Sequence, residues 1–178
     1  MKEITLHNKK FEVFISETEI AAIVHSMANN INDLRIKDPL FISVLNGSFM
    51  FSSDIMKKIT LPNTEISFVK LSSYSGTQTT GKVNELIGLG KDIKNRNVII
   101  LEDIIDTGIT VEKIMSLLEK EKVADIKVAT LLFKPEAYKK DIEIDFIGKS
   151  ILNDFVVGYG LDYDEIGRNL PHIFKLKN

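Results

Sequence analysis

Three carboxylates beside a threonine-glycine turn form the feature of this sequence with the clearest chemistry. The segment is apolar and of strand type over Val98–Leu101. It then carries, in order, Glu102, Asp103, Asp106 and Thr107-Gly108-Ile109-Thr110. Apolar residues recur at helical spacing directly afterwards, at Val111, Ile114, Met115 and Leu118. The pattern indicates a strand, an acidic loop and a helix in immediate succession.

The turn has the groups that a phosphate needs. A helix start offers free backbone N–H groups, the two threonines add hydroxyls, and Gly108 allows a ligand to approach closely. Neighbouring carboxylates would repel a bare phosphate, but they suit a sugar phosphate. Glu102 and Asp103 can accept hydrogen bonds from ribose hydroxyls, and Asp106 is left for proton transfer. We therefore interpret residues 102–110 as a nucleotide site.

Two simpler interpretations fit the same residues. One is an acidic strand-to-helix turn with an ordinary N-cap, and the other is an acidic magnesium pocket of the receiver type. Spacing alone leaves all three open.

Apolar runs alternate with helical patterns along the chain. Ser16 and Glu19 have the spacing of a capping box and predict a helix over residues 17–32. A second helix is expected around Phe51, Ile55 and Ile59. Strands are predicted at Leu40–Leu45, Ile66–Leu71, Val98–Leu101 and Val128–Phe133. This order predicts an α/β protein with a mostly parallel sheet covered on both faces, whose ligands bind beyond the carboxyl ends of the strands.

Composition narrows the function further. The 178 residues, 44% hydrophobic and 27% charged, fit one compact domain, and the net charge of −2 argues against a protein that coats nucleic acid. No cysteine is present, which excludes disulfides, a thiolate nucleophile and cysteine-ligated zinc. With no apolar signal region or membrane-length segment, we expect a cytoplasmic protein.

Glu102-Asp103-Ile104-Ile105-Asp106-Thr107-Gly108 resembles the signature of type I phosphoribosyltransferases, in the form of the hypoxanthine-guanine branch. The similarity extends in the same order through other segments, at Leu45–Phe51, Ser73-Tyr74, Leu131–Lys134 and Phe155–Arg168. It implies one phosphoribosyltransferase domain over residues 1–178. That domain has a small hood, which we define as residues of about 1–15 and 150–178.

The resemblance implies a reaction as well. Hypoxanthine or guanine would react with 5-phosphoribosyl 1-pyrophosphate in purine salvage, giving IMP or GMP and pyrophosphate with Mg²⁺ as cofactor. The 5′-phosphate would lie on Asp106, Thr107, Gly108, Ile109 and Thr110, and the ribose and magnesium at Glu102 and Asp103. Asp106 would be the general base near purine N7.

The base would bind to residues further along the chain. Lys134 follows a strand, and its ammonium, with three donors and no acceptor, complements a 6-oxo group and disfavours adenine. By resemblance Phe155 stacks on the purine, the Val156 backbone contacts its edge, and Asp162 lies near both magnesium and the purine amino edge. A solvated surface lysine and an ordinary core aromatic are the simpler interpretations of Lys134 and Phe155.

The resemblance also places the leaving group. Leu45, Asn46 and Gly47, with a cis peptide bond after the leucine, and Arg168 would contact pyrophosphate. Many relatives carry lysine where this chain has Asn46, which predicts weaker charge stabilisation at this loop. The polar stretch of residues 72–82 would form a lid that closes Ser73 and Tyr74 over the reaction centre; without the resemblance it would be a plain mobile hairpin.

Three alternatives remain at this stage. The chain could be a nucleotide-sensing regulator of the same fold, a xanthine-preferring transferase, or a transferase for adenine, which Lys134 disfavours. The resemblance also predicts a homodimer or homotetramer, with no nucleic-acid or membrane partner.

Overall fold

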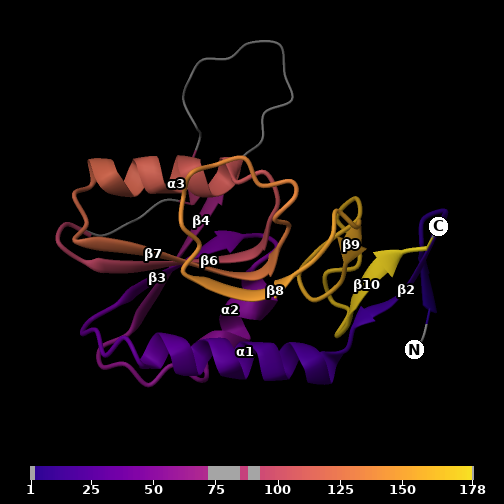
Figure 1. Cartoon of the computed structure of the whole chain (residues 1–178), viewed down its shortest axis with the longest axis horizontal. Coiled ribbons are helices and arrows are strands. Elements are labelled where there is room, and N and C mark those ends of the chain that lie inside the picture. The colour runs from indigo at the N-terminus through magenta and orange to yellow at the C-terminus, as the bar shows by residue number, and fades with distance from the viewer. Residues whose placement is uncertain (1–2, 72–84, 88–92, 178) are drawn as a thin grey trace, which may run out of the picture.

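The computed structural model describes residues 3–71, 85–87 and 93–177. Ser73, Tyr74 and the rest of the expected lid lie outside these ranges. Figure 1 shows the described elements, which are, in chain order, β1 (Glu3–Leu6), β2 (Lys9–Ile15), α1 (Glu17–Asn32), β3 (Leu40–Leu45), α2 (Phe49–Met56), β4 (Glu65–Leu71), β5 (Glu85–Ile87), β6 (Asn97–Ile105), α3 (Ile109–Lys120), β7 (Asp125–Phe133), β8 (Phe146–Ser150), β9 (Val156–Val157) and β10 (Ile173–Leu176).

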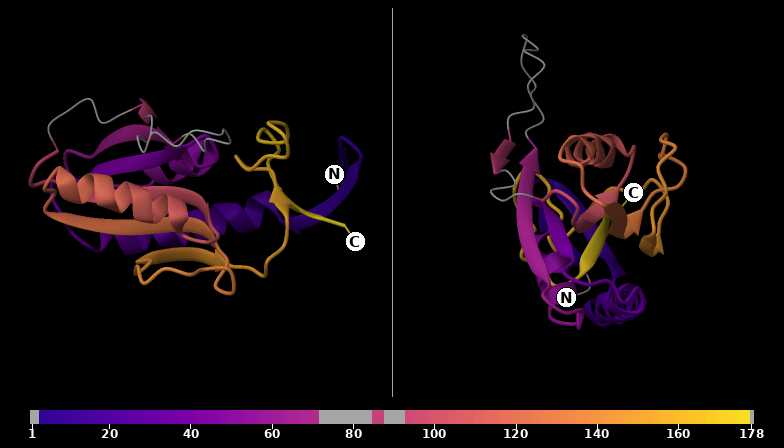
Figure 2. Two further views of the ribbon diagram at one scale, coloured as in Figure 1. Left: turned by 90° about the horizontal axis from the view of Figure 1, so that it is seen from above. Right: turned by 90° about the vertical axis from the view of Figure 1, so that its left-hand side faces the viewer.

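The larger sheet has the strand order β5-β4-β3-β6-β7-β8. β4, β3, β6, β7 and β8 run parallel, and β5 is antiparallel to β4. Helix α3 covers one face and α1 and α2 cover the other, as Figure 1 and the right view of Figure 2 show. Alternate residues of β3 and β6 pack toward opposite faces, which gives two separate apolar cores. The predicted α/β class with a mostly parallel, two-sided sheet is confirmed.

Helix α1 begins where the sequence places it. The Ser16 hydroxyl accepts a hydrogen bond from the Glu19 N–H at 3.2 Å, which satisfies one free donor of the first turn. The Glu19 carboxylate lies 2.7 Å from Lys149 on the edge strand β8. The side chain expected to close a capping box therefore ties the helix to the sheet. The buried side of α1 is Ile20, Val24, Met27, Ala28 and Ile31.

Several elements differ in length from their predictions. β6 continues to Ile105 because its pairing with β7 extends to Ile105 opposite Phe133. Glu102 and Asp103 therefore belong to the strand rather than to the loop after it. β7 and β4 begin earlier than expected, at Asp125 and Glu65. Helix α2 ends at Met56, so Ile59 lies beyond it.

A second sheet unites the two ends of the chain. Its order is β1-β2-β10-β9, and its core is Phe11, Val157 and Phe174. The left view of Figure 2 shows this sheet beyond one end of the larger one. The expected hood of N- and C-terminal segments is thus present. Within the described residues, no helix combines the length and apolarity needed to cross a membrane.

Candidate active site

Residues 45–47, residues 102–110 and Lys134 lie at or just beyond the ends of strands along one edge of the larger sheet. Parallel strands β3, β6 and β7 end at Leu45, Ile105 and Phe133. A cavity of about 350 Å³ lies there, and its lining includes Leu45, Gly47, Glu102, Asp103 and Thr110. The structure therefore brings some of the residues predicted for ribose, pyrophosphate and phosphate to one space.

The turn after β6 has the geometry of an anion site. Helix α3 begins at Ile109, and its N-cap Gly108 has a left-handed φ of 82°. A hollow of about 90 Å³ is lined by the loop from Asp106 to Thr110. A Cβ on Gly108 would collide with the Tyr138 ring, so glycine is required by both its backbone angle and its surroundings. The free amides of the first helical turn and the helix dipole favour an anionic ligand here.

Glu102 and Asp103 are neighbouring carboxyl groups in the last part of β6, before this loop. Glu102 is 4% exposed. Burial raises the pKa of Glu102 well above its ordinary value, and the neighbouring Asp103 charge raises it further. Burial also raises the pKa of Asp103, to about 6, against the lowering effect of its backbone hydrogen bonds and of the Arg168 guanidinium. The two side chains hydrogen-bond to each other, and their oxygens can accept hydrogen bonds from ribose hydroxyls.

Carboxylates of this kind are suitable magnesium ligands, but the pair is not joined by a third. Among residues 3–71, 85–87 and 93–177, no three acidic or histidine side chains come together as a metal cluster. Asp162 lies 2.8 Å from Arg168 and accepts the Glu165 N–H at 2.8 Å. The carboxylate oxygens of Glu102 and Asp103 fit Mg²⁺, which keeps several of its water ligands and would be held largely by the substrate.

Lys134 contacts both Asp106 of the phosphate loop and Asn153 of the hood. The Lys134 ammonium lies 3.1 Å from the Asp106 carboxylate and donates to the amide oxygen of Asn153 at 3.3 Å. Lys134 is 8% exposed, and its backbone N–H donates to Ile105 at the end of β6. It is therefore not a solvated surface lysine. With two of its three donors used, one remains for a ligand.

Phe155 offers an exposed aromatic face. It is 44% exposed and is therefore not a core aromatic. The Tyr163 ring packs against it edge-on at 5.6 Å, and the Lys9 ammonium lies 5.9 Å from its centre. Val156 begins β9 and lies opposite Lys175 of β10. The arrangement can accept a flat ring.

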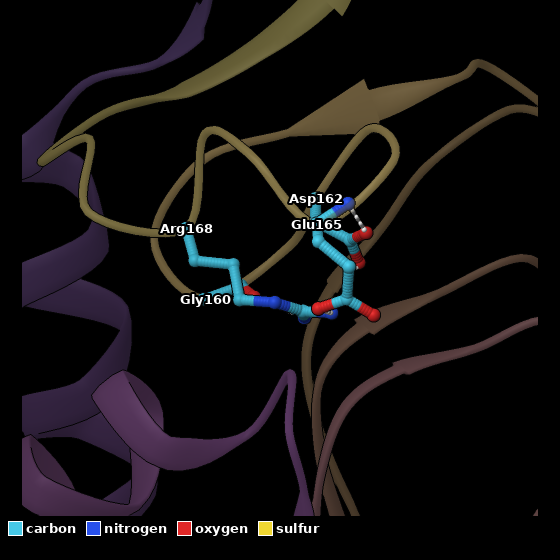
Figure 3. A network of polar contacts seen from close by, with 4 residues as sticks. All are labelled: Gly160, Asp162, Glu165 and Arg168. Carbon is cyan, nitrogen blue, oxygen red and sulfur yellow. Dashed lines mark hydrogen bonds and ion pairs between the residues drawn. The ribbon is translucent and has the colours of Figure 1, made fainter.

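The loop after β3 contacts both the carboxyl pair and the hood. Its Leu45-Asn46 peptide bond is cis, as expected. Gly47 packs so closely on Asp103 that a Cβ would collide with that carboxylate. Arg168 donates to the Gly160 carbonyl at 2.9 Å and pairs with Asp162 and Glu165, a network shown in Figure 3.

Two further side chains of this region are not evident from the sequence. Lys113, the fifth residue of α3, lines the cavity of about 350 Å³, and its only sequence signal was a cation near the start of that helix. Asn153 holds Lys134 from a segment with no pattern of its own. A separate hollow of about 450 Å³ lies between α1 and β8. Its one carboxylate, Asp145, is already bonded to Lys127 and to the Val128 N–H, so that hollow offers no comparable chemistry.

The comparisons agree with this geometry. Residues 15–164 match the model of the phosphoribosyl transferase domain. The hypoxanthine-guanine phosphoribosyltransferase of Staphylococcus aureus strain Mu50 is 42% identical over 174 residues, with 97% of each chain covered.

Solved structures are similar over nearly the whole chain. A hypoxanthine phosphoribosyltransferase from Staphylococcus aureus has a TM-score of 0.86 at 42% identity, covering 93% of this chain and 91% of that one. A hypoxanthine-guanine phosphoribosyltransferase from Bacillus anthracis has a TM-score of 0.86 at 37% identity, covering 93% and 98%. Fold and sequence together define a phosphoribosyltransferase. More narrowly, the chain belongs to the hypoxanthine-guanine phosphoribosyltransferase family.

Proposed function

We propose that this protein is a purine salvage enzyme that transfers the phosphoribosyl group of 5-phosphoribosyl 1-pyrophosphate to hypoxanthine or guanine. The observation that carries the proposal is the Asp106–Lys134 pair, with 3.1 Å between carboxylate and ammonium; Lys134 also donates to Asn153, two residues before the exposed Phe155. A 6-oxopurine requires three contacts, which are a proton acceptor, a donor for its 6-oxo group and a surface on which it stacks.

The sugar phosphate is held first. Its 5′-phosphate occupies the turn from Asp106 to Thr110, where free amides and the helix dipole favour an anion. The ribose hydroxyls donate hydrogen bonds to the carboxyl oxygens of Glu102 and Asp103. Binding of both groups fixes the anomeric carbon relative to the base, so the entropic cost of orienting the two reactants is met before they react.

The base binds against Phe155. Lys134 donates its remaining N–H to the 6-oxo group, and the Val156 backbone contacts the purine edge. As purine N9 bonds to the anomeric carbon, the bond from that carbon to pyrophosphate breaks and its electron pair leaves with pyrophosphate, while N7 loses its proton to Asp106. The 3.1 Å contact with Lys134 would hold the Asp106 carboxylate in place for that transfer.

Glu102 and Asp103 would hold the substrate's Mg²⁺ from the ribose side, where the ion would supply neutralisation of the departing pyrophosphate. Leu45, Asn46 and Gly47 would donate backbone groups to pyrophosphate, and Arg168 would add its guanidinium. Asp162 would lie near magnesium and the purine amino edge, and its pairing with Arg168 at 2.8 Å would also orient that arginine. Ser73 and Tyr74 remain predicted lid residues.

Self-association is part of the proposal. Three large apolar side chains, Phe49, Ile66 and Phe68, are exposed. Ile66 and Phe68 lie opposite Phe41 and Ser43 of β3, on the face that α2 covers. A second copy of the chain would bury these side chains, and sedimentation of the parent beside Phe68→Asp would test this self-association.

The expected cytoplasmic location stays a prediction that cell fractionation would check.

Initial rates test the proposed function directly. Hypoxanthine, guanine, xanthine and adenine would each be supplied with phosphoribosyl pyrophosphate, with and without magnesium. We expect turnover with hypoxanthine or guanine, little with adenine, and loss of activity when the metal is chelated. Turnover with none of the four bases, together with tight nucleotide binding, would favour the regulatory alternative instead. Xanthine as the preferred base would replace the substrate assignment.

A further inference from the structure

One tyrosine joins the hood to the core of the molecule. Tyr159 is 4% exposed, and its hydroxyl donates to Asp54 of α2 at 2.7 Å across a separation of 105 residues. The other oxygen of Asp54 lies 2.9 Å from Lys57. Burial raises the pKa of Asp54, but the hydrogen bonds from Lys57 and Tyr159 outweigh it and hold that pKa below its ordinary value. The hydroxyl of Tyr159 therefore binds an ionised carboxylate.

Tyr159 occupies a backbone position that favours glycine. Its φ is 50°, between Gly158 at 98° and Gly160 at 99°. Three successive left-handed residues form a tight loop, in which any side chain is conformationally costly. The tyrosine offsets that cost with a buried ring and a charge-assisted hydrogen bond. A side chain kept at such a position points to a specific role for its contacts.

The next residue carries the contact to the pyrophosphate side of the site. Gly160 packs so closely on the Gly47 carbonyl that a Cβ would collide with it. Its own carbonyl accepts from Arg168 at 2.9 Å, and its N–H donates to the Arg168 carbonyl at 2.9 Å. Figure 3 shows how Arg168 lies along Gly160 and reaches Asp162. The position of this arginine thus depends on the loop that Tyr159 anchors.

We propose that Tyr159 and Asp54 are a positioning pair that sets Arg168 and the loop of residues 45–47 in register for pyrophosphate. The pair touches no substrate. It fixes the hood loop on helix α2, whose N-terminus directly follows residues 45–47, so both halves of the pyrophosphate site share one anchor. The contacts of Arg168 with pyrophosphate oxygens weaken when the arginine is displaced even slightly. An anchor that holds the arginine in place therefore affects pyrophosphate binding. The inference rests on the proposed function.

Titration calorimetry with two probes separates positioning from general stability. Magnesium pyrophosphate reports on Arg168 and residues 45–47, and ribose 5-phosphate reports on the loop of residues 106–110. Tyr159→Phe keeps the ring and loses the hydroxyl, and Asp54→Ala loses the acceptor. We expect each to weaken magnesium pyrophosphate about tenfold, the value of one charge-assisted hydrogen bond, and to leave ribose 5-phosphate unchanged.

Three further variants sharpen the test. The double variant should bind magnesium pyrophosphate no more weakly than either single one, because both remove the same bond. Asp54→Asn keeps an oxygen that accepts from Tyr159 and should retain most of the affinity. Lys57→Ala removes the other neighbour of Asp54 and serves as the matched control, with unchanged affinity.

The outcomes are distinct. Tyr159→Phe binding magnesium pyrophosphate as tightly as the parent overturns the inference, as does an equal loss for both probes, which would mark a purely structural role. If the parent protein itself fails to bind magnesium pyrophosphate, the proposed function fails and the inference falls with it. Selective loss of pyrophosphate affinity in Tyr159→Phe and Asp54→Ala supports it.

Discussion

The carboxylate of Asp106 lies 3.1 Å from the ammonium of Lys134, although 28 residues separate them in the chain. The contact exists because β6 and β7 are adjacent parallel strands whose ends meet at the same edge of the sheet. It places a proton acceptor beside a donor for the base. Each of these two functions can be removed separately.

Replacing Asp106 by asparagine should reduce catalysis without removing the phosphate site. The amide retains the shape of the carboxylate and its contact with Lys134, but it accepts a proton poorly. We expect the turnover rate to fall roughly 100-fold or more, with phosphoribosyl pyrophosphate affinity within about threefold of the parent, since an isosteric amide leaves the loop amides in place. Single-turnover kinetics and calorimetry measure the two quantities. Glu136→Gln, at an exposed carboxylate nearby, is the control, and equal turnover in Asp106→Asn and parent would refute the base assignment.

Lys134→Ala should lose the preference for 6-oxopurines. The ammonium donates to an oxo group and opposes the amino group of adenine, so its removal leaves neither favoured. The ratio of kcat/KM for hypoxanthine to that for adenine should fall at least about 100-fold. Lys139→Ala, an exposed lysine in the same segment, is the matched control. An unaltered ratio in Lys134→Ala would mean that discrimination lies elsewhere.

Much of this arrangement could be predicted from sequence because it depends on short segments. The helix at Glu17–Asn32 and the strand at Leu40–Leu45 have the predicted bounds, since apolar periodicity and an N-cap are local signals. The end of β6 was predicted four residues too early. Glu102 and Asp103 interrupt the apolar run, and only pairing with β7 keeps them in the strand.

Long-range contacts could not be predicted in the same way. The bonds from Tyr159 to Asp54 and from Lys134 to Asn153 join segments whose spacing carries no periodic signal. The family resemblance supplied Lys134 and Arg168 as site residues but not the side chains that hold them. Asp162 is expected near magnesium by resemblance, and that role stays a prediction; its 2.8 Å contact with Arg168 is a further contact that spacing did not predict.

The buried carboxyl pair should make stability depend on pH in a defined direction. The pKa of Asp103 is raised to about 6, and that of Glu102 is also raised, so the folded protein binds more protons than the unfolded chain above about pH 4. The contribution of the pair to stability is therefore present at low pH and is lost as pH rises through these folded-state values.

Glu102→Gln should remove most of this effect. In chelator-treated protein, its free energy of unfolding relative to the parent should increase between pH 5 and pH 8 by on the order of 1 to 2 kcal/mol. Urea denaturation at both pH values measures the difference. A relative stability that stays constant, or falls, with rising pH would show that the pair is not the source.

Gly160→Ala should disturb the contact between the hood and the loop of residues 45–47. The backbone at Gly160 has a φ of 99°, and a Cβ there would meet the rigid carbonyl of Gly47. We expect a loss of about 2 kcal/mol in the free energy of unfolding, with weaker magnesium pyrophosphate binding. Unchanged urea midpoint and affinity would show that this close approach is not needed.

A crystal structure of the protein with IMP bound tests the central claim most directly. The account predicts the phosphate on the backbone amides of residues 107–110, the ribose hydroxyls within hydrogen-bonding distance of Glu102 and Asp103, and the purine on Phe155. Density for the nucleotide at another surface, with residues 102–110 contacting no part of it, would contradict the account.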